Sequence, residues 1–219
     1  MVHIRTAEEI EKIRESCRIV SETLDLLSRE IKSGITTLYL DHLAAEFIKS
    51  QGGHSAFKGY NGFPGNICTS IDEQVVHGIP SNRVLKEGEI ISIDVGVKKN
   101  GYYGDAAMTF AVGTVSDDRL QLMRVTEDAL YQGIAQARPG NHLSDIGHAI
   151  QTHVESYGYG VVRELVGHGV GRELHEPPEI PNYGEPGRGP VLKPGMCLAI
   201  EPMITMGSHE VRLLKDGWT

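Results

Sequence analysis

The sequence has few cysteines and no long apolar stretch, and these absences exclude several classes of protein. Its cysteines, Cys17, Cys68 and Cys197, are odd in number and scattered, which favours reduced thiols in a cytosol over a disulfide framework. No apolar run approaches the ~18 residues of a membrane span, and the charged amino terminus, MVHIRTAEEIEKIR, is unlike a signal peptide. We therefore expect a cytoplasmic protein without a membrane partner.

Positive charge is also scarce, because 21 lysines and arginines stand against 29 aspartates and glutamates, for a formal net charge of −8. Proteins that bind nucleic acid need a basic face, so no nucleic-acid partner is expected. The 219 residues are 40% hydrophobic and 23% charged, which is enough for the core of one globular domain or two small ones.

The stretch 90–110 carries two aspartates eleven residues apart around an Asn-Gly pair at 100–101. This pair between two alternating runs predicts a two-residue hairpin turn, because both turn positions need positive φ. In that register Gly96 lies opposite Asp105, and Asp94 is a diagonal neighbour of Asp105 on the same face. The other face is apolar and is predicted to pack on a core: Ile91, Ile93, Val95, Val97, Ala106, Met108 and Phe110.

The two carboxylates, Asp94 and Asp105, would repel each other, and burial raises the cost of keeping both ionised. A divalent cation between them would remove that penalty. From the hairpin alone, the alternative is two solvated aspartates on an exposed sheet face.

Helical periodicity predicts helices that begin near residues 6, 37, 116 and 143, and the stretch 56–80 is predicted to be loop and short strands rather than core. The pattern of two helices and a strand that ends in a carboxylate occurs twice. Leu40 aligns with Ile146 at a shift of 106, and Asp94 aligns with Glu201 at a shift of 107. We therefore expect one catalytic domain, 1–219, built as an α+β fold from half-repeats of about 6–112 and 113–219.

The second half contains a turn signal, Asp216-Gly217, and ends at Thr219 without a strand that matches the one carrying Asp105. A chain that ends where a strand should begin leaves the neighbouring strand with unpaired backbone groups, which is unfavourable at a natural terminus. The expectation is a chain truncated at its carboxyl end.

A histidine between two glycines, His168, lies where the backbone can approach a ligand closely. A lone histidine is more often structural than a ligand, but three candidate carboxylates favour the ligand interpretation: Asp94, Asp105 and Glu201. Oxygen ligands with one imidazole suit Mn, Fe, Co or Zn better than a thiolate-rich structural site. Two further histidines in Gly/Pro-rich loops, His77 and His175, are expected to bond to substrate, with ordinary surface histidines as the alternative.

The chain resembles the type I methionine aminopeptidases, which have the pita-bread fold, over residues 6–218. The shared motifs are VVHGIP at 75–80, SIDVG at 92–96, YGDAA at 103–107, GHGVGRELHEPP at 167–178 and IEPM at 200–203. The resemblance implies a pseudo-two-fold arrangement of helix pairs on a curved antiparallel sheet, here with the last strand missing.

The resemblance also implies two divalent ions (Co, Mn, Fe, Zn or Ni), with Asp105 bridging both of them. By position, the ligands in this chain are Asp94, Asp105, His168 and Glu201. The family's second glutamate belongs to the missing strand, so one weakly bound ion or none, and little activity, are expected of this chain.

The resemblance further implies that Glu201, His77 and His175 are catalytic, and that His77 and His175 contact the scissile peptide. The methionine pocket is implied for Tyr60, Phe63, Cys68 and Trp218. At Leu174 the chain departs from the aromatic residue of many relatives.

The implied function is hydrolytic removal of the amino-terminal methionine from nascent proteins and peptides with a small second residue. The alternatives are a proline-directed pita-bread aminopeptidase and a non-catalytic pita-bread module that binds proteins. Nascent polypeptides are the expected partners, the ribosome is left open as another, and a monomer is expected.

Overall fold

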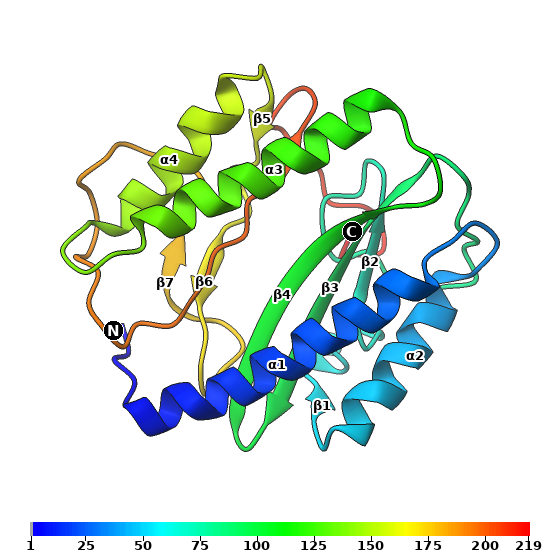
Figure 1. Ribbon diagram of the computed structural model, residues 1–219, viewed down its shortest axis with the longest axis horizontal. Helices are drawn as coiled ribbons and strands as arrows, with labels where there is room; N and C mark the ends of the chain where they lie inside the picture. The colour runs from blue at the N-terminus through cyan, green and yellow to red at the C-terminus, as the bar shows by residue number, and fades with distance from the viewer. Residues whose placement is uncertain (1) are drawn as a thin grey trace. The chain divides into compact units, whose positions relative to one another are not determined.

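The computed structural model describes residues 2–219, and within them the chain is an α+β protein, as predicted. The elements, drawn in Figure 1, are α1 (Ala7–Glu30), α2 (Thr37–Ser50), β1 (His54–Ser55), η1 (Tyr60–Gly62), β2 (Cys68–Ile71), β3 (Ile90–Lys99), β4 (Tyr102–Ala111), α3 (Asp117–Gln136), α4 (Leu143–Glu155), β5 (Gly160–Val161), β6 (Gly167–Gly169), β7 (Glu176–Ile180), β8 (Leu198–Ala199) and β9 (Ile204–Thr205). Among the described residues, no helix is both long and apolar enough to cross a membrane.

The chain divides into two compact units. We call the first the amino-terminal unit; it contains Glu11–Asp117, Gly171–Leu174 and Leu213–Thr219. The second, the carboxy-terminal unit, contains the residues up to Ile10 together with Asp118–Val170 and His175–Arg212.

The amino-terminal unit is built on the hairpin of β3 and β4. Its register is the predicted one, with Gly96 opposite Asp105 and Asp94 opposite Ala107. The turn residues Asn100 and Gly101 have φ values of 50° and 79°, as a type I′ turn requires. Strands β1 and β2 pair antiparallel with the other edge of β3, so β3 is the central strand.

Helices α1 and α2 cover one face of this sheet (Figure 1) and form its core. From the sheet, β3 contributes four fully buried side chains: Ile91, Ile93, Val95 and Val97. The prediction that Ala106 and Met108 also pack on the core is wrong, because Met108 is 51% exposed and Ala106 is exposed too. The physical reason is that β4 lies at the edge of the sheet, where among the described residues it pairs with β3 alone.

The stretch 56–80 was predicted to lie outside the core, and this is also wrong. It contains β2, whose four residues are all buried. It also contributes buried side chains before that strand, at Phe57, Phe63 and Ile67. Its glycines and prolines had suggested an exposed loop, but they allow the chain to fold back on itself instead.

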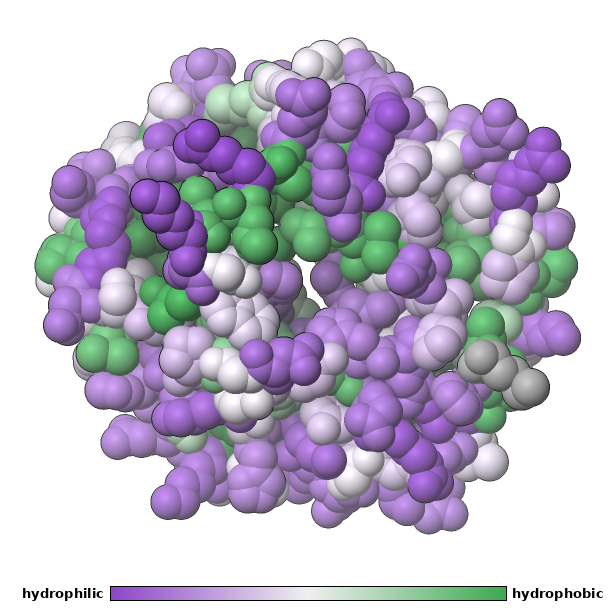
Figure 2. All heavy atoms as spheres, turned by 180° about the vertical axis from the view of Figure 1, so that it is seen from behind, coloured by the Kyte–Doolittle hydropathy of each residue, from purple (hydrophilic) through white to green (hydrophobic). Residues whose placement is uncertain are grey.

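In the carboxy-terminal unit, α3 and α4 pack on short antiparallel strands (Figure 1). Strand β6 pairs with β7 on one edge and β8 on the other, and β5 pairs with β9. The helices begin and end close to the predicted positions. Most side chains on the face shown in Figure 2 are hydrophilic, and hydrophobic residues are scattered among them.

The two units contain matching hydrogen bonds at the offsets of the sequence repeat. The N–H of Leu85 donates to Ile35 O at 2.8 Å, and the N–H of Leu192 donates to Asn141 O, also at 2.8 Å. The isolated bridge of Thr36 with Val84 likewise has a counterpart between His142 and Val191. These contacts fix the start of α2 in one unit and of α4 in the other.

One matched position differs between the units. Asp41 of α2 is buried, and its carboxylate accepts hydrogen bonds from the N–H groups of Asn66 and Ile67. The matching residue of α4 is Gly147, and a Cβ built there would lie 2.2 Å from Pro181 O. In the carboxy-terminal unit the loop main chain therefore occupies the space that a side chain fills in the other unit.

Candidate metal centre

In the amino-terminal unit, the hairpin places Asp94 and Asp105 on one face of the sheet, two positions apart in register. Cys68 of β2 lies directly opposite Asp94. Burial, together with the negative charges of Asp94 and Asp105, raises the pKa of the Cys68 thiol far above its usual value. The thiol therefore stays protonated and neutral beside the two carboxylates.

In the carboxy-terminal unit, His168 lies on the central strand of the three-stranded sheet. Its glycine neighbours are required, because a Cβ at Gly167 would lie 2.3 Å from Ala199 O and a Cβ at Gly169 would lie 2.5 Å from Pro177 O. The neighbouring strands can therefore close on both sides of the histidine. The residue is buried, with 7% of its surface exposed.

The imidazole of His168 lies between two oxygens. Its Nδ1 is 2.9 Å from the carbonyl oxygen of Gly169, and its Nε2 is 3.0 Å from Oε1 of Glu201. A carbonyl only accepts, so Nδ1 carries a proton, and in a neutral ring Nε2 then presents a lone pair. A lone pair and a carboxylate oxygen repel each other, so a cation or a proton is needed between Nε2 of His168 and Oε1 of Glu201.

These residues fit a divalent metal ion. A metal-binding histidine commonly donates its other N–H to a backbone carbonyl, which fixes the tautomer, and His168 does so to Gly169. Oxygen and imidazole donors without thiolate suit Mn, Fe, Co, Ni or Zn. The structure thus brings His168 and Glu201 together, and it places Asp94 and Asp105 on one face of the hairpin, as the register predicted.

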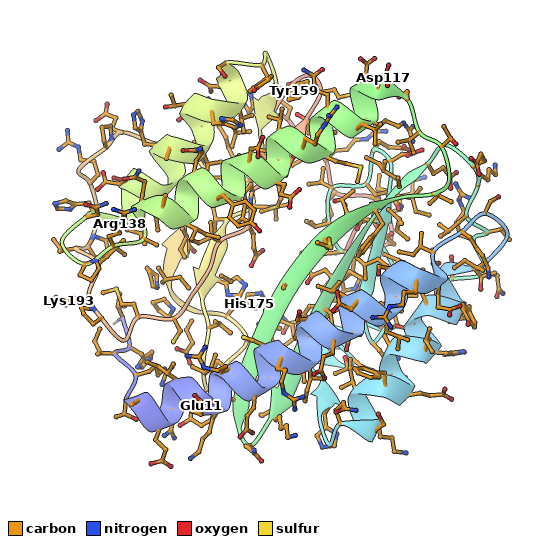
Figure 3. All side chains as sticks on the ribbon, in the orientation of Figure 1. Glu11, Asp117, Arg138, Tyr159, His175 and Lys193 are labelled. Atoms are coloured by element: carbon orange, nitrogen blue, oxygen red, sulfur yellow. The ribbon has the colours of Figure 1, made fainter. Side chains whose placement is uncertain are left out.

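His175 lies beside His168, with a distance of 4.3 Å between the ring centroids and the rings nearly perpendicular. Unlike His168 it is exposed, and it directly precedes β7 (Figure 3). The next residue, Glu176, is buried and forms an ion pair with the buried Arg5. The accessible imidazole of His175 thus lies next to the buried imidazole of His168, immediately before a strand whose first residue, Glu176, is held by an ion pair.

An apolar cluster in the amino-terminal unit contains three of the four predicted pocket residues. The ring centroids of Phe63 and Trp218 are 5.1 Å apart with an edge-on geometry, and Cys68 belongs to the same cluster. Leu174 is also a buried member. The fourth predicted residue, Tyr60, is 38% exposed and lies outside this cluster.

Sequence reasoning missed other members of this cluster: Ala56, Phe57, Ile79 and Tyr103. One signal in the sequence could have indicated that a large side chain packs there: Gly96, opposite Asp105, has no side chain and leaves space on the strand. The Phe57 ring fills that space, since a Cβ at Gly96 would lie 2.5 Å from it. A glycine within a strand often marks such a close approach.

The turn at 216–217, predicted from its Asp-Gly pair, holds Trp218 in place. The carboxylate of Asp216 accepts hydrogen bonds from the N–H groups of Trp218 and Thr219, both at 2.9 Å. It also accepts one from the Thr219 hydroxyl at 2.6 Å, and these bonds lower the pKa of Asp216.

His77 contacts Trp218, with 6.3 Å between the ring centroids. Its φ of 58° lies in the left-handed region, which is uncommon for a residue other than glycine and is often found at functional sites. Burial lowers the pKa of His77, and a hydrogen bond to the Trp218 backbone opposes that shift in part.

We expect the fluorescence of Trp218 to report the protonation of His77. Trp218 is the one tryptophan in the sequence, and a protonated imidazole beside it should quench its emission. Because the pKa is lowered, quenching should have its midpoint below the ordinary value of 6.5. Below pH 6.5 the unfolded chain binds this proton more readily than the folded chain, so His77 should also reduce stability as the pH falls.

The measurement is a fluorescence titration of the folded protein. His77→Gln should abolish the step, whereas His42→Gln, at an exposed position of α2, should preserve it. A midpoint at or above 6.5 in the unmodified protein would contradict the expectation.

Comparison with known proteins agrees with this geometry. The model of metallopeptidase family M24 matches residues 11–218. The chain is 56% identical over 219 residues to Methionine aminopeptidase 1 of Bacillus subtilis, covering all of this chain and 88% of that protein. It is 46% identical to the crystal structure of a methionine aminopeptidase from Thermotoga maritima, with a TM-score of 0.98, covering 100% of this chain and 88% of the other.

A prolidase from Pyrococcus furiosus is more distant, at 27% identity and a TM-score of 0.79, covering 91% of this chain and 57% of the other. The likeness to these structures confirms the pita-bread fold expected from the sequence. The chain therefore belongs to metallopeptidase family M24 and, within it, to the type I methionine aminopeptidases.

Proposed function

We propose that this chain is a metal-dependent aminopeptidase that removes the amino-terminal methionine from peptides and nascent proteins with a small second residue. The observation that carries the proposal is the His168–Glu201 pair, because both nitrogens of one buried imidazole face oxygen acceptors. The high identity to proteins named methionine aminopeptidases supports the choice of substrate.

The proposed ligands are two carboxylates from the amino-terminal unit and an imidazole and a carboxylate from the carboxy-terminal unit. They are Asp94, Asp105, His168 and Glu201, which would hold the divalent ions. Divalent ions held by such residues supply Lewis-acid chemistry, because they polarise a carbonyl group and lower the pKa of a water molecule. Membership of a metallopeptidase family supports the use of divalent ions, and the donor set suits Co, Mn, Fe, Zn or Ni.

Glu201 is proposed to take a proton from the attacking water and pass it to the leaving amine. His175, which is accessible beside His168, is proposed to donate a hydrogen bond to the carbonyl oxygen of the scissile peptide as negative charge develops there. His77 is proposed to contact the same peptide. Its lowered pKa keeps it neutral at pH 7, so that it can donate or accept a hydrogen bond.

The methionine side chain is proposed to occupy the cluster that contains Phe63, Cys68 and Trp218, with Tyr60 at its exposed margin. A flexible, polarizable thioether packs well against aromatic rings. The neutral Cys68 thiol adds no charge to this surface, because its pKa is raised. A cluster of this composition favours an unbranched apolar side chain over a charged one.

The remaining proposals concern organisation and setting. Residues of about 6–112 and 113–219 are proposed to be half-repeats of one catalytic domain, 1–219, and the matching hydrogen bonds at the repeat offsets support this. A cytoplasmic monomer is proposed, and a reducing compartment is supported because no disulfide forms among the described cysteines, Cys17, Cys68 and Cys197.

A comparison of substrates tests the proposed activity. The Co²⁺-loaded protein, whose turnover is expected to be low, should hydrolyse Met-Gly-X peptides and leave X-Pro-X peptides intact, because the apolar cluster selects the first side chain. Mass spectrometry of the products measures both reactions in one mixture. Preferential cleavage of X-Pro-X would favour the proline-directed alternative that the structural likeness to prolidase admits. Loss of neither substrate, with Co²⁺ bound, would favour a binding module.

A further inference from the structure

Asn182 is a fully buried polar residue that contacts Glu201. It lies in the loop after β7 of the carboxy-terminal unit and has 0% of its surface exposed. Its side-chain amide donates a hydrogen bond to the main-chain carbonyl of Glu201 at 2.7 Å. Its other side-chain atom, Oδ1, is buried and has no hydrogen-bond partner among residues 2–219. An asparagine is costly at such a position unless the bond it makes is needed.

The main chain of Glu201 lies beyond the paired residues of strand β8. Strand β8 ends at Ala199, which is the last residue of that strand paired with β6. Residue 202 is proline, which restricts Glu201 to an extended backbone and has no N–H to donate. The hydrogen bond from Asn182 therefore fixes the carbonyl of Glu201, two residues beyond the last residue of β8 that pairs with β6.

Asn182 itself is held against helix α4. The residues on either side of it approach Gly147 so closely that a Cβ there would lie 2.2 Å from Pro181 O and 2.8 Å from Tyr183 N. The N–H of Gly184 also donates to the side chain of Gln151 on α4 at 3.0 Å. The loop is thus packed on a rigid helix, and Asn182 cannot shift without displacing it.

These contacts form a continuous path from α4 through Asn182 to Glu201, and from the Glu201 carboxylate to Nε2 of His168 at 3.0 Å. We propose that Asn182 is a positioning residue, which ties the main chain of Glu201 to α4 and so holds its carboxylate at His168 for a divalent ion. This inference rests on the proposed function, because it takes Glu201 and His168 as metal ligands. Partners that orient metal ligands commonly contribute 10- to 100-fold to metal affinity.

The test compares two substitutions at Asn182 with the same two at Asn141. Asn141 is the matched control: it lies in the same unit, and its amide also donates to a main-chain carbonyl, that of Gln136, at 3.0 Å. Asn182→Ala removes the donor, and Asn182→Asp removes it with almost no change in shape. Isothermal titration with Co²⁺ alone gives the affinity, the visible spectrum of bound Co²⁺ gives the coordination geometry, and thermal melting gives the stability.

Both Asn182 variants should bind Co²⁺ at least about 10-fold more weakly and with an altered spectrum, whereas the Asn141 variants should match the unmodified protein. The aspartate variant should lose more, because its carboxylate faces the carbonyl of Glu201. If the Asn182 variants melt at a lower temperature but bind Co²⁺ with unchanged affinity and spectrum, Asn182 is only structural and the inference is wrong.

Failure of the proposed function gives a different result. If the unmodified protein binds no Co²⁺, or if Glu201→Gln binds it as tightly as the unmodified protein, the ligand assignment fails whatever the Asn182 variants do. The inference would then fall with that assignment. Kinetics add a second criterion, because a displaced carboxylate should lower kcat and leave KM for a Met-Gly-X peptide nearly unchanged.

Discussion

Glu201→Gln and Asp105→Asn are each expected to weaken Co²⁺ binding and to lower kcat/KM on a Met-Gly-X peptide by about 100-fold or more. An amide is a weaker and uncharged donor, and loss of a direct ligand should cost at least as much as loss of a residue that only orients one. The two carboxylates belong to different units of the chain. A loss of affinity with both changes would support the proposal that both residues are metal ligands.

The control variants make the same kinds of substitution at exposed positions away from the proposed site. Glu155→Gln, on the exposed surface of α4, and Asp25→Asn, on the exposed surface of α1, should leave both quantities unchanged. Titration calorimetry and steady-state kinetics make the measurement. If Asp105→Asn alone keeps full affinity, the carboxylates of the hairpin are not ligands and the proposed site is reduced to the carboxy-terminal unit.

Arg5→Ala is expected to destabilise the fold by about 3–5 kcal/mol, because it removes one partner of the buried ion pair between Arg5 and Glu176. Only 6% of each side chain is exposed, and the Arg5 main chain is also held, by a hydrogen bond to Gly195 O at 2.8 Å. Unfolding in urea measures the free energy. Since Glu176 follows His175 directly, we also expect the variant to lose activity at temperatures where it remains folded.

The control for Arg5 is Arg18→Ala, which breaks an ion pair with Glu22 on the exposed face of α1. Exposed pairs of this kind contribute about 0–1 kcal/mol. The double variant R5M/E176Q should be more stable than Arg5→Ala, because it removes both charges of the buried pair. Equal losses for Arg5→Ala and Arg18→Ala would show that burial of the Arg5 pair has no energetic consequence.

Much of the fold follows from local signals in the sequence. The hairpin register could be predicted because Asn100 and Gly101 accept the positive φ of a type I′ turn, and the turn then fixes every pair of residues. The start of α1 could be predicted from a capping box, in which the N–H of Thr6 donates to Glu9 and the N–H of Glu9 donates to Thr6 Oγ1. These signals involve residues close together in the chain.

The errors and omissions involve residues far apart in the chain. Alternation along β4 says which way Met108 points, but not that its side chain is left exposed on an edge strand. The partner of Arg5 lies 171 positions away, and the bond from Asn182 to Glu201 has no periodic pattern that could reveal it. The candidate ligands were accessible from sequence because their motifs are specific, whereas the residues that support them were not.

The difference between Asp41 and Gly147 has a consequence for how freely the two halves could be recombined. In a chimera with α2 in the place of α4, a carboxylate would meet the carbonyl of Pro181, which is itself an acceptor. With α4 in the place of α2, the N–H groups of Asn66 and Ile67 would lose the acceptor they now share. Although they share a common plan, the two helices are therefore not interchangeable modules, and each is matched to the loop beside it.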